Sequence, residues 1–191
     1  MDTVYVHADE SCLGNQFQNR ANPGGAAGLV EVWKDGLWHR RDYWLSEPDT
    51  TNNRMALRSA IDVLRALTQP CIVHFVSDSQ YLVKGIGEWL PGWKARGWRR
   101  KSGPIENLGL WQELDGELQR HDVRPRWVRG HAGHAENEYA DLLATRAARE
   151  QTASAGLVTS GFVPWLDGQR ERGKSMGDLE SAPPVERFGI P

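Results

Sequence analysis

Hydrophobic and polar positions in the first part of the chain follow the period of strands. Residues 4–8 alternate and are rich in β-formers, which predicts a strand that ends at Asp9. Residues 26–33 and 37–45 flank the hairpin signal Asp35-Gly36 and predict two further strands. The chain is therefore expected to begin as three consecutive strands.

The pattern then changes to the period of a helix at residues 52–67. The preceding Thr50-Thr51-Asn52-Asn53 is a start signal, because Thr and Asn side-chain oxygens accept the free N–H groups of a first turn. Apolar residues recur on one face of this helix at Leu57, Ala60, Ile61, Leu64 and Leu67. Residues 71–76 form a nearly continuous apolar run, as in a strand covered on both faces. The other expected elements are helices at 80–87, 108–120 and 135–149 and a short strand at 126–128.

This order predicts an α/β fold with a mixed five-stranded sheet flanked by helices. From about residue 151 the pattern decays, and Ser, Gly and Pro recur. We expect one domain at residues 1–150 and a flexible tail at residues 151–191, with Phe162, Trp165 and Leu166 as its candidate docking points.

Composition narrows the class of protein. No run of about 18 apolar residues is present, so no membrane helix is expected. Two cysteines, Cys12 and Cys71, do not make a disulfide framework, and the N-terminus lacks a signal pattern, so we expect a cytoplasmic protein.

Charge is distributed unevenly along the chain. The formal net charge is −2, yet basic residues gather in two groups that could bind phosphates. The first group is interleaved with Trp93 and Trp98 in the segment 88–103, which could instead be a solvated surface helix. Its members are Lys94, Arg96, Arg99, Arg100 and Lys101, and the second group is Arg120, Arg124, Arg126 and Arg129.

Three aspartates are candidates for metal chemistry. Asp9 and Asp78 follow predicted strands, and Asp141 lies in the last helix. Ligands tend to bind beyond the C-terminal ends of parallel strands, and converging carboxylates suit Mg²⁺. Each aspartate taken alone could equally be a cap or a turn residue. The loop histidines His131 and His134 lack the further ligands of a zinc site and could simply bond to backbone.

Taken together, several segments of the chain resemble the bacterial ribonuclease HI family. They occur in the family's order over roughly residues 1–150. The matching segments are Asp9 to Asn15, Thr50 to Met55, Ser77 to Tyr81, Trp89 to Trp98, Asn107, Leu110-Trp111, Trp127 to His134, and Glu136 to Glu138 leading to Asp141.

The resemblance implies a ribonuclease H-like fold and an endoribonuclease that cleaves the RNA strand of RNA–DNA hybrids. It also implies two Mg²⁺ or Mn²⁺ ions held by four carboxylates, of which Asp9, Asp78 and Asp141 match three. His131 matches a loop histidine that assists proton transfer or product release. By the same resemblance the hybrid partner would be contacted by Cys12, Asn15, Thr51, Asn52, Asn53, Gln80, Trp89 and Asn107. No feature of the sequence requires an oligomer, so we expect the protein to be a monomer.

Two positions depart from the family's pattern. Ala56 stands where the family has a glutamate ligand, and Glu10 stands where it usually has glycine. Alternation along a strand predicts that Glu10 points away from Asp9 as a surface charge, although a turn could redirect it. We therefore expect a weakened second metal site and impaired cleavage. The alanine at position 56 is open to three interpretations: an engineered inactive enzyme, a natural member with weak or Mn²⁺-dependent activity, and a hybrid-binding protein without catalysis.

Overall fold

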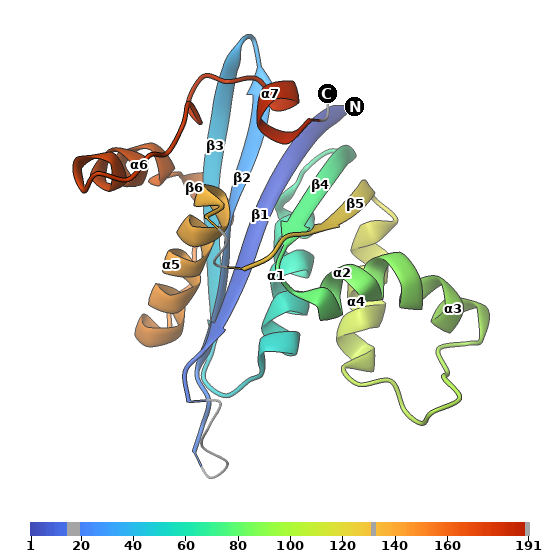
Figure 1. The fold of residues 1–191 in the computed structure, drawn as a ribbon. Coiled ribbons are helices and arrows are strands. Elements are labelled where there is room, and N and C mark those ends of the chain that lie inside the picture. The colour runs from blue at the N-terminus through green and yellow to red at the C-terminus, as the bar shows by residue number, and fades with distance from the viewer. Residues whose placement is uncertain (15–19, 131–132, 190–191) are drawn as a thin grey trace.

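A six-stranded mixed sheet forms the centre of the molecule in a computed structural model that describes residues 1–14, 20–130 and 133–189 (Figure 1). Its strand order is β5-β4-β1-β2-β3-β6. The central strand β1 runs antiparallel to β2 and parallel to β4. The strands are β1 (Asp2–Cys12), β2 (Gly24–Lys34), β3 (Leu37–Glu47), β4 (Cys71–Ser77), β5 (Asp122–Trp127) and β6 (Val158–Thr159).

Helices cover both faces of this sheet. In Figure 1, α1 lies behind the strands and α5 lies in front of them. The helical elements are α1 (Asn52–Ala66), α2 (Gln80–Lys84), the π-helical turn η1 (Gly85–Trp89), α3 (Leu90–Ala95), α4 (Leu108–Leu118), α5 (Ala135–Glu150), α6 (Phe162–Glu171) and α7 (Pro184–Phe188). None of the helices in the described ranges is long and apolar enough to cross a membrane.

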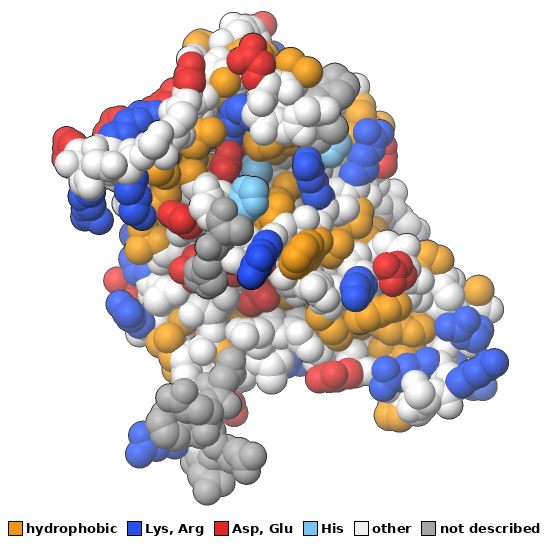
Figure 2. Space-filling model, viewed as in Figure 1, with side chains coloured by type: hydrophobic (Ala, Val, Ile, Leu, Met, Phe, Trp, Pro, Cys, Tyr) orange, Lys and Arg blue, Asp and Glu red, His pale blue; other side chains and the backbone are white. Residues whose placement is uncertain are grey.

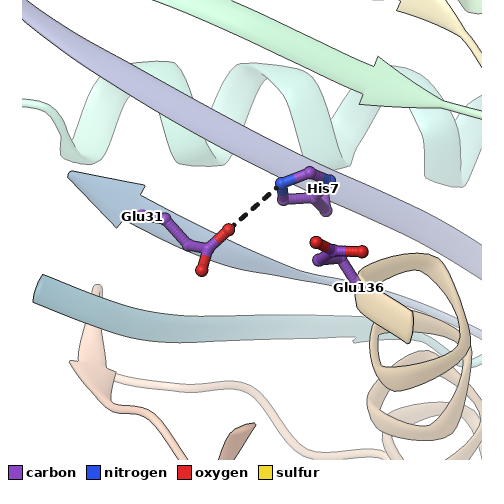
Figure 3. Close-up of side chains that lie close together, drawn as sticks. All are labelled: His7, Glu31 and Glu136. Atoms are coloured by element: carbon purple, nitrogen blue, oxygen red, sulfur yellow. Dashed lines mark ion pairs between the residues drawn. The ribbon is translucent and has the colours of Figure 1, made fainter. Parts of the chain in front are cut away.

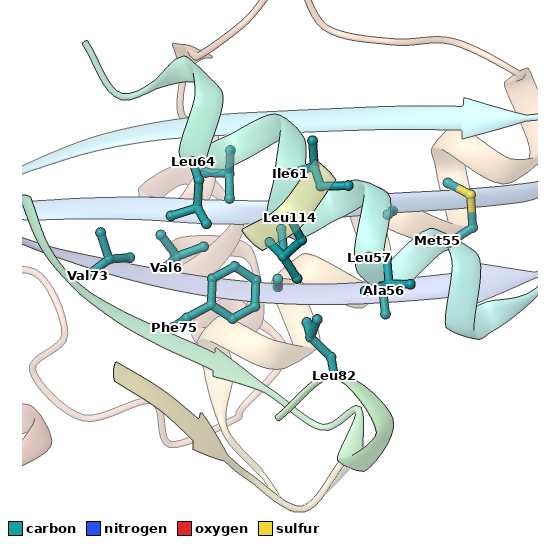
Figure 4. Close-up of a cluster of buried hydrophobic side chains, with 14 of the residues drawn as sticks. Val6, Met55, Ala56, Leu57, Ile61, Leu64, Val73, Phe75, Leu82 and Leu114 are labelled. Atoms are coloured by element: carbon teal, nitrogen blue, oxygen red, sulfur yellow. The ribbon is translucent and has the colours of Figure 1, made fainter. Parts of the chain in front are cut away.

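The main core lies between the sheet and α1 (Figure 4). The predicted apolar face of α1 is fully buried, and Leu57, Ile61 and Leu64 are each 0% exposed. They belong to one cluster with Val6 and Phe75 of the central strands. Burial of such side chains contributes about 1.5–3 kcal/mol each, so this layer fixes α1 on the sheet. The Thr51 hydroxyl caps α1 by accepting from the Arg54 amide, as the start signal predicts.

Element ends differ most from the sequence prediction in three places. Strand β1 continues to Cys12, because it stays paired with β2 up to the Cys12–Gly24 register. Strand β5 begins at Asp122 because it pairs in parallel with β4 from that residue. The helix expected to stop at residue 87 continues through η1 into α3, where Pro91 lies in the first turn and needs no backbone donor.

The segment after residue 150 packs on the domain, in contrast to the predicted flexible tail. Strand β6 pairs with β3 and adds the sixth strand. The expected docking residues Phe162 and Leu166 are both 0% exposed, and the Phe162 ring lies 5.3 Å from that of Tyr139 in α5. At the other end of this C-terminal extension, the ring of Phe188 stacks on Tyr5 at 4.7 Å.

Replacing Phe162 with Ala tests this packing. We expect the free energy of unfolding in urea to fall by about 3 kcal/mol, because the change empties a fully buried aromatic site. The control is Val185→Ala at a position that is 59% exposed, which should change stability by less than about 0.5 kcal/mol. Equal small effects of the two substitutions would show that the extension is not docked.

Candidate active site

Three carboxylates converge where β4 ends beside the central strand β1. Asp9 lies on β1, and Asp78 directly follows β4, the parallel neighbour of β1. Ligand oxygens of Asp9, Glu10 and Asp78 all lie within 4.8 Å of one another. The structure thus brings together two predicted ligands and adds a third residue, Glu10, whose predicted direction was wrong.

Glu10 reaches the site although strand alternation holds. Alternation fixes the direction of the bond from Cα to Cβ, whereas the glutamate carboxylate lies further along a rotatable chain. The residue two positions earlier, Ala8, belongs to the core cluster that contains α1, so Glu10 leaves β1 on the α1 side of the sheet. Its backbone amide donates to Asp9 Oδ1 at 2.7 Å. Glu10 is therefore a partly buried member of the cluster and not a surface charge.

Position 56 lies in the same layer. Ala56 is 1% exposed and belongs to the core cluster with Ala8 and Leu57 (Figure 4). Ala56 and Glu10 therefore both lie on the α1 side of the sheet, and so would the glutamate that the family resemblance leads us to expect at position 56.

The carboxylates of the site repel one another. Burial, followed by the charge of Asp78, raises the pKa of Asp9 to about 8, and the charge of Asp141 contributes in the same direction. Burial and the charges of Asp9 and Asp78 raise the pKa of Glu10 well above its usual value. Crowded oxygen ligands of this kind fit a hard divalent cation, which would relieve their repulsion.

Helix α5 brings two more side chains to the site. Asp141 comes close enough for its charge to act on Asp9, and Thr145 Oγ1 donates to its carboxylate at 3.5 Å. Asn137 Nδ2 donates to Asp9 Oδ2 at 3.4 Å, and Asn137 is buried. No role for Asn137 was predicted from the sequence. Its spacing of four residues from Asp141 places both on one helix face, which could have indicated it.

The position of the Asp78 side chain requires a residue without a Cβ atom at position 130, which is Gly130. A Cβ atom added at Gly130 would lie 2.3 Å from Asp78 Oδ2. The Trp127 indole also donates to the Asp78 backbone oxygen at 3.0 Å, which ties the end of β5 to the site. His131 lies outside the described residues, and His134 is the N-cap residue of α5 without a side-chain cap bond.

The predicted hybrid-contact residues lie mainly at the starts of helices. Asn52 and Asn53 form the first turn of α1, Gln80 begins α2, and Asn107 precedes α4. Asn107 Nδ2 donates to the Tyr81 hydroxyl at 3.3 Å. Every described member of the set is exposed or partly exposed, and Asn15 lies outside the described residues. The described members are Cys12, Thr51, Asn52, Asn53, Gln80, Trp89 and Asn107.

Comparison with known proteins decides the family. The family model for RNase H matches residues 1–149. The ribonuclease H of Stutzerimonas stutzeri is 49% identical over 146 residues, which cover 76% of this chain and 91% of the relative. Ribonuclease HI of Pseudomonas aeruginosa is 44% identical over 151 residues, covering 78% and 95%.

This chain belongs to the ribonuclease H family. A solved structure described as LC9-RNase H1, a type 1 RNase H with the type 2 active-site motif, is 50% identical, superposes with a TM-score of 0.86, and covers 98% of this chain and 90% of its own. The family depends on divalent metal, and the acidic cluster at Asp9 agrees with that requirement. The predicted ribonuclease H-like α/β fold is confirmed.

Proposed function

We propose that this ribonuclease H hydrolyses the RNA strand of RNA–DNA hybrids with a carboxylate set in which Glu10 takes the place of the glutamate expected at position 56. As a family member the chain is an endoribonuclease for such hybrids. The observation that carries the proposal is the convergence of Asp9, Glu10 and Asp78 within 4.8 Å. LC9-RNase H1 supports it, since that relative also departs from the type 1 motif.

Each residue of the set has a proposed task. Asp9, Glu10, Asp78 and Asp141 would hold two divalent ions, and Mg²⁺ fits their oxygen ligands best. When bound, such ions neutralise charge that develops at the scissile phosphate. Asn137 holds the Asp9 carboxylate in place through its amide donor. All of these residues come from one chain, so a monomer suffices.

With four carboxylates available, the predicted weakening of the second metal site loses its basis. A hybrid-binding protein without catalysis would have no use for this buried and mutually repelling set of acids. We propose that His131 assists proton transfer or product release, as in the family. The hybrid would lie across the residues at the helix starts, and we propose that Cys12, Asn15 and Trp89 contact it as well.

The experiment that tests the proposal is cleavage of a labelled hybrid in Mg²⁺ and in Mn²⁺ by the unchanged chain and by Asp78→Asn. We expect cleavage by the first and none by the second, with hybrid binding retained by both. Equal cleavage by both proteins would overturn the proposed carboxylate set.

Binding of metal should release protons. The raised pKa of Asp9, about 8, means that this carboxyl holds a proton at pH 7 in the metal-free protein. Ligation requires the ionised form, so Mg²⁺ binding at pH 7 should release at least about one proton, and at pH 9.5 fewer. Calorimetry in buffers of different ionisation enthalpy measures this number. A release that does not vary with pH would contradict the assignment.

The basic segment around α3 should grip the nucleic acid backbone. Figure 2 shows Lys and Arg side chains gathered over the α3 end of the molecule. Arg99 and Arg100 are exposed there. We expect Arg99→Ala/Arg100→Ala to weaken hybrid binding and to reduce the salt slope of log K by about 1–2.

The matched control for the basic segment is Lys34→Ala/Arg41→Ala. It removes two exposed positive charges from the β2–β3 hairpin, away from α3. Fluorescence anisotropy between 50 and 200 mM salt, roughly the range over which phosphate contacts matter, compares the variants. Equal slopes in the two double variants would mean that the α3 end does not contact the hybrid.

A further inference from the structure

A buried carboxylate on β2 organises charges from three parts of the chain. Glu31 is 0% exposed and is paired across the sheet with Tyr5 on one side and Arg40 on the other. The Arg40 guanidinium donates to it at 2.8 Å, and His7 Nε2 lies 3.3 Å away. A buried charge of this kind is stable only when it is paired, so whatever pairs with Glu31 is held firmly.

The remaining partner of Glu31 comes from the C-terminal extension. Arg187 of α7 donates to both Glu31 oxygens at 2.9 Å, and its side chain is 2% exposed. The same guanidinium donates to Glu136 at 2.6 Å. Burial alone would raise the pKa of Glu31, but the neighbouring His7 and Arg187 side chains lower it to about 2. Arg187 thus joins two buried carboxylates with a planar fork of donors.

Figure 3 shows His7, Glu31 and Glu136 pointing toward one another in front of the sheet. Their ligand atoms lie within 4.8 Å of one another, a spacing that could also hold a metal ion. The Arg187 guanidinium already bonds to both carboxylates of this group. The cation of this cluster is therefore supplied by the protein itself, and it is carried by the last helix of the chain.

Glu136 connects this cluster to the active site. It lies in the first turn of α5, directly before Asn137, which donates to Asp9. One turn further on, Asp141 faces the site. The extension holds α5 a second time at Asp42 of β3, which accepts from Tyr139 at 2.6 Å, from the Ser160 hydroxyl at 2.6 Å and from the Gly161 amide at 2.9 Å.

We propose that Arg187 is a positioning residue of this ribonuclease H, which fixes the start of α5 on the sheet through Glu31 and Glu136 and so holds Asn137 and Asp141 in place beside Asp9. This inference rests on the proposed carboxylate site. Arg187 lies beyond residues 1–149, the part that the family model matches. The clamp therefore comes from outside the part of the chain that the family model matches. Its effect should be seen in metal affinity and kcat more than in the KM for the hybrid.

The test compares Arg187→Met, Arg187→Lys and Arg170→Met in the full chain. Arg170 pairs with Asp167 and Glu180 inside the extension, so Arg170→Met removes an ion pair there without touching α5. Each variant is assayed for Mn²⁺ affinity by calorimetry and for kcat and KM with a hybrid, at a temperature at which it remains folded. Its thermal unfolding is measured separately.

We expect Arg187→Met to weaken Mn²⁺ binding and to lower kcat by about tenfold or more, with KM changed less than about threefold. Arg187→Lys should recover part of both, because an ammonium supplies charge without the fork. Arg170→Met should lower the melting temperature and leave kcat and Mn²⁺ affinity within about twofold. A less stable Arg187→Met protein with unchanged kcat and Mn²⁺ affinity would overturn the proposal, since Arg187 would then be only structural.

Two further variants keep the outcome decisive. Glu136→Met removes both oxygens that can accept from Arg187 while keeping a side chain of similar length, so it provides the same test if Arg187→Met does not fold, and its unchanged kcat would equally overturn the positioning role. Asp78→Asn distinguishes a failure of the proposed carboxylate site from a failure of the Arg187 clamp. Activity retained by Asp78→Asn would overturn the carboxylate site, whereas activity lost in Asp78→Asn but retained in Arg187→Met would overturn the clamp alone.

Discussion

The Glu10→Gln variant is expected to lose at least about 100-fold in kcat while it still binds an RNA–DNA hybrid. Its carboxylate lies within 4.8 Å of those of Asp9 and Asp78, so the amide removes one charged ligand from the proposed metal site. A loss of about 3 kcal/mol of transition-state stabilisation corresponds to this factor. Steady-state cleavage in Mg²⁺, together with anisotropy for hybrid binding, measures both quantities. The control is Glu88→Gln, an exposed glutamate of η1.

A swap of the carboxylate between strand and helix gives a sharper version of this test. Glu10→Gly should be as impaired as Glu10→Gln, and Ala56→Glu added to Glu10→Gly should restore much of the activity. The reason is that Ala56 lies in the layer from which Glu10 enters the site. Ala56→Glu alone should destabilise the protein, because a second acid would enter a position that is 1% exposed. Full activity in Glu10→Gln, or no recovery in the double variant, would refute the substitution of one carboxylate for the other.

Gly130→Ala is expected to lower activity by about 10- to 100-fold and to weaken metal binding without unfolding the protein. The added Cβ would lie 2.3 Å from Asp78 Oδ2, so the carboxylate must turn away. A misplacement of this size at a reacting centre costs about 100-fold in rate. The core cluster around α1 does not include Gly130, so the free energy of unfolding should change by less than about 1 kcal/mol.

Calorimetry with Mn²⁺ and urea unfolding separate these two effects for Gly130. The control is Gly116→Ala in α4, where an added Cβ meets no described atom within 4 Å. That substitution should leave activity unchanged and raise stability slightly, since alanine favours a helix. If Gly130→Ala kept both activity and metal affinity, the observed position of Asp78 would not be the one used in catalysis.

The sequence by itself determined the elements that are built from local signals. The periods of apolar residues predicted the α1 face and the buried β4, because burial of one face imposes those periods on any helix or strand. The order of motifs from Asp9 to Asp141 predicted the family. The approach of Asp9 to Asp78 followed from the rule that ligands gather beyond parallel strand pairs, and the parallel pairing of β1 with β4 ends at Ala8 and Ser77, directly before these two residues. These features depend on residues that are close in sequence or on a fold rule that applies to many sheets.

Only the tertiary structure decided the features that depend on contacts between distant residues. Alternation gave the direction of the Cα–Cβ bond of Glu10 but not the position of its carboxylate, which lies within 4.8 Å of those of Asp9 and Asp78. Asn137 reaches Asp9 across 128 positions, and Arg187 reaches Glu31 across 156. The composition of the tail, rich in Ser, Gly and Pro, is typical of a flexible segment. The tail nevertheless packs on the domain, because its few apolar and charged side chains contact buried partners on the sheet and α5. Position 56 thus proved less informative alone than together with residue 10, since a metal site depends on where its oxygen atoms meet and not on which element carries them.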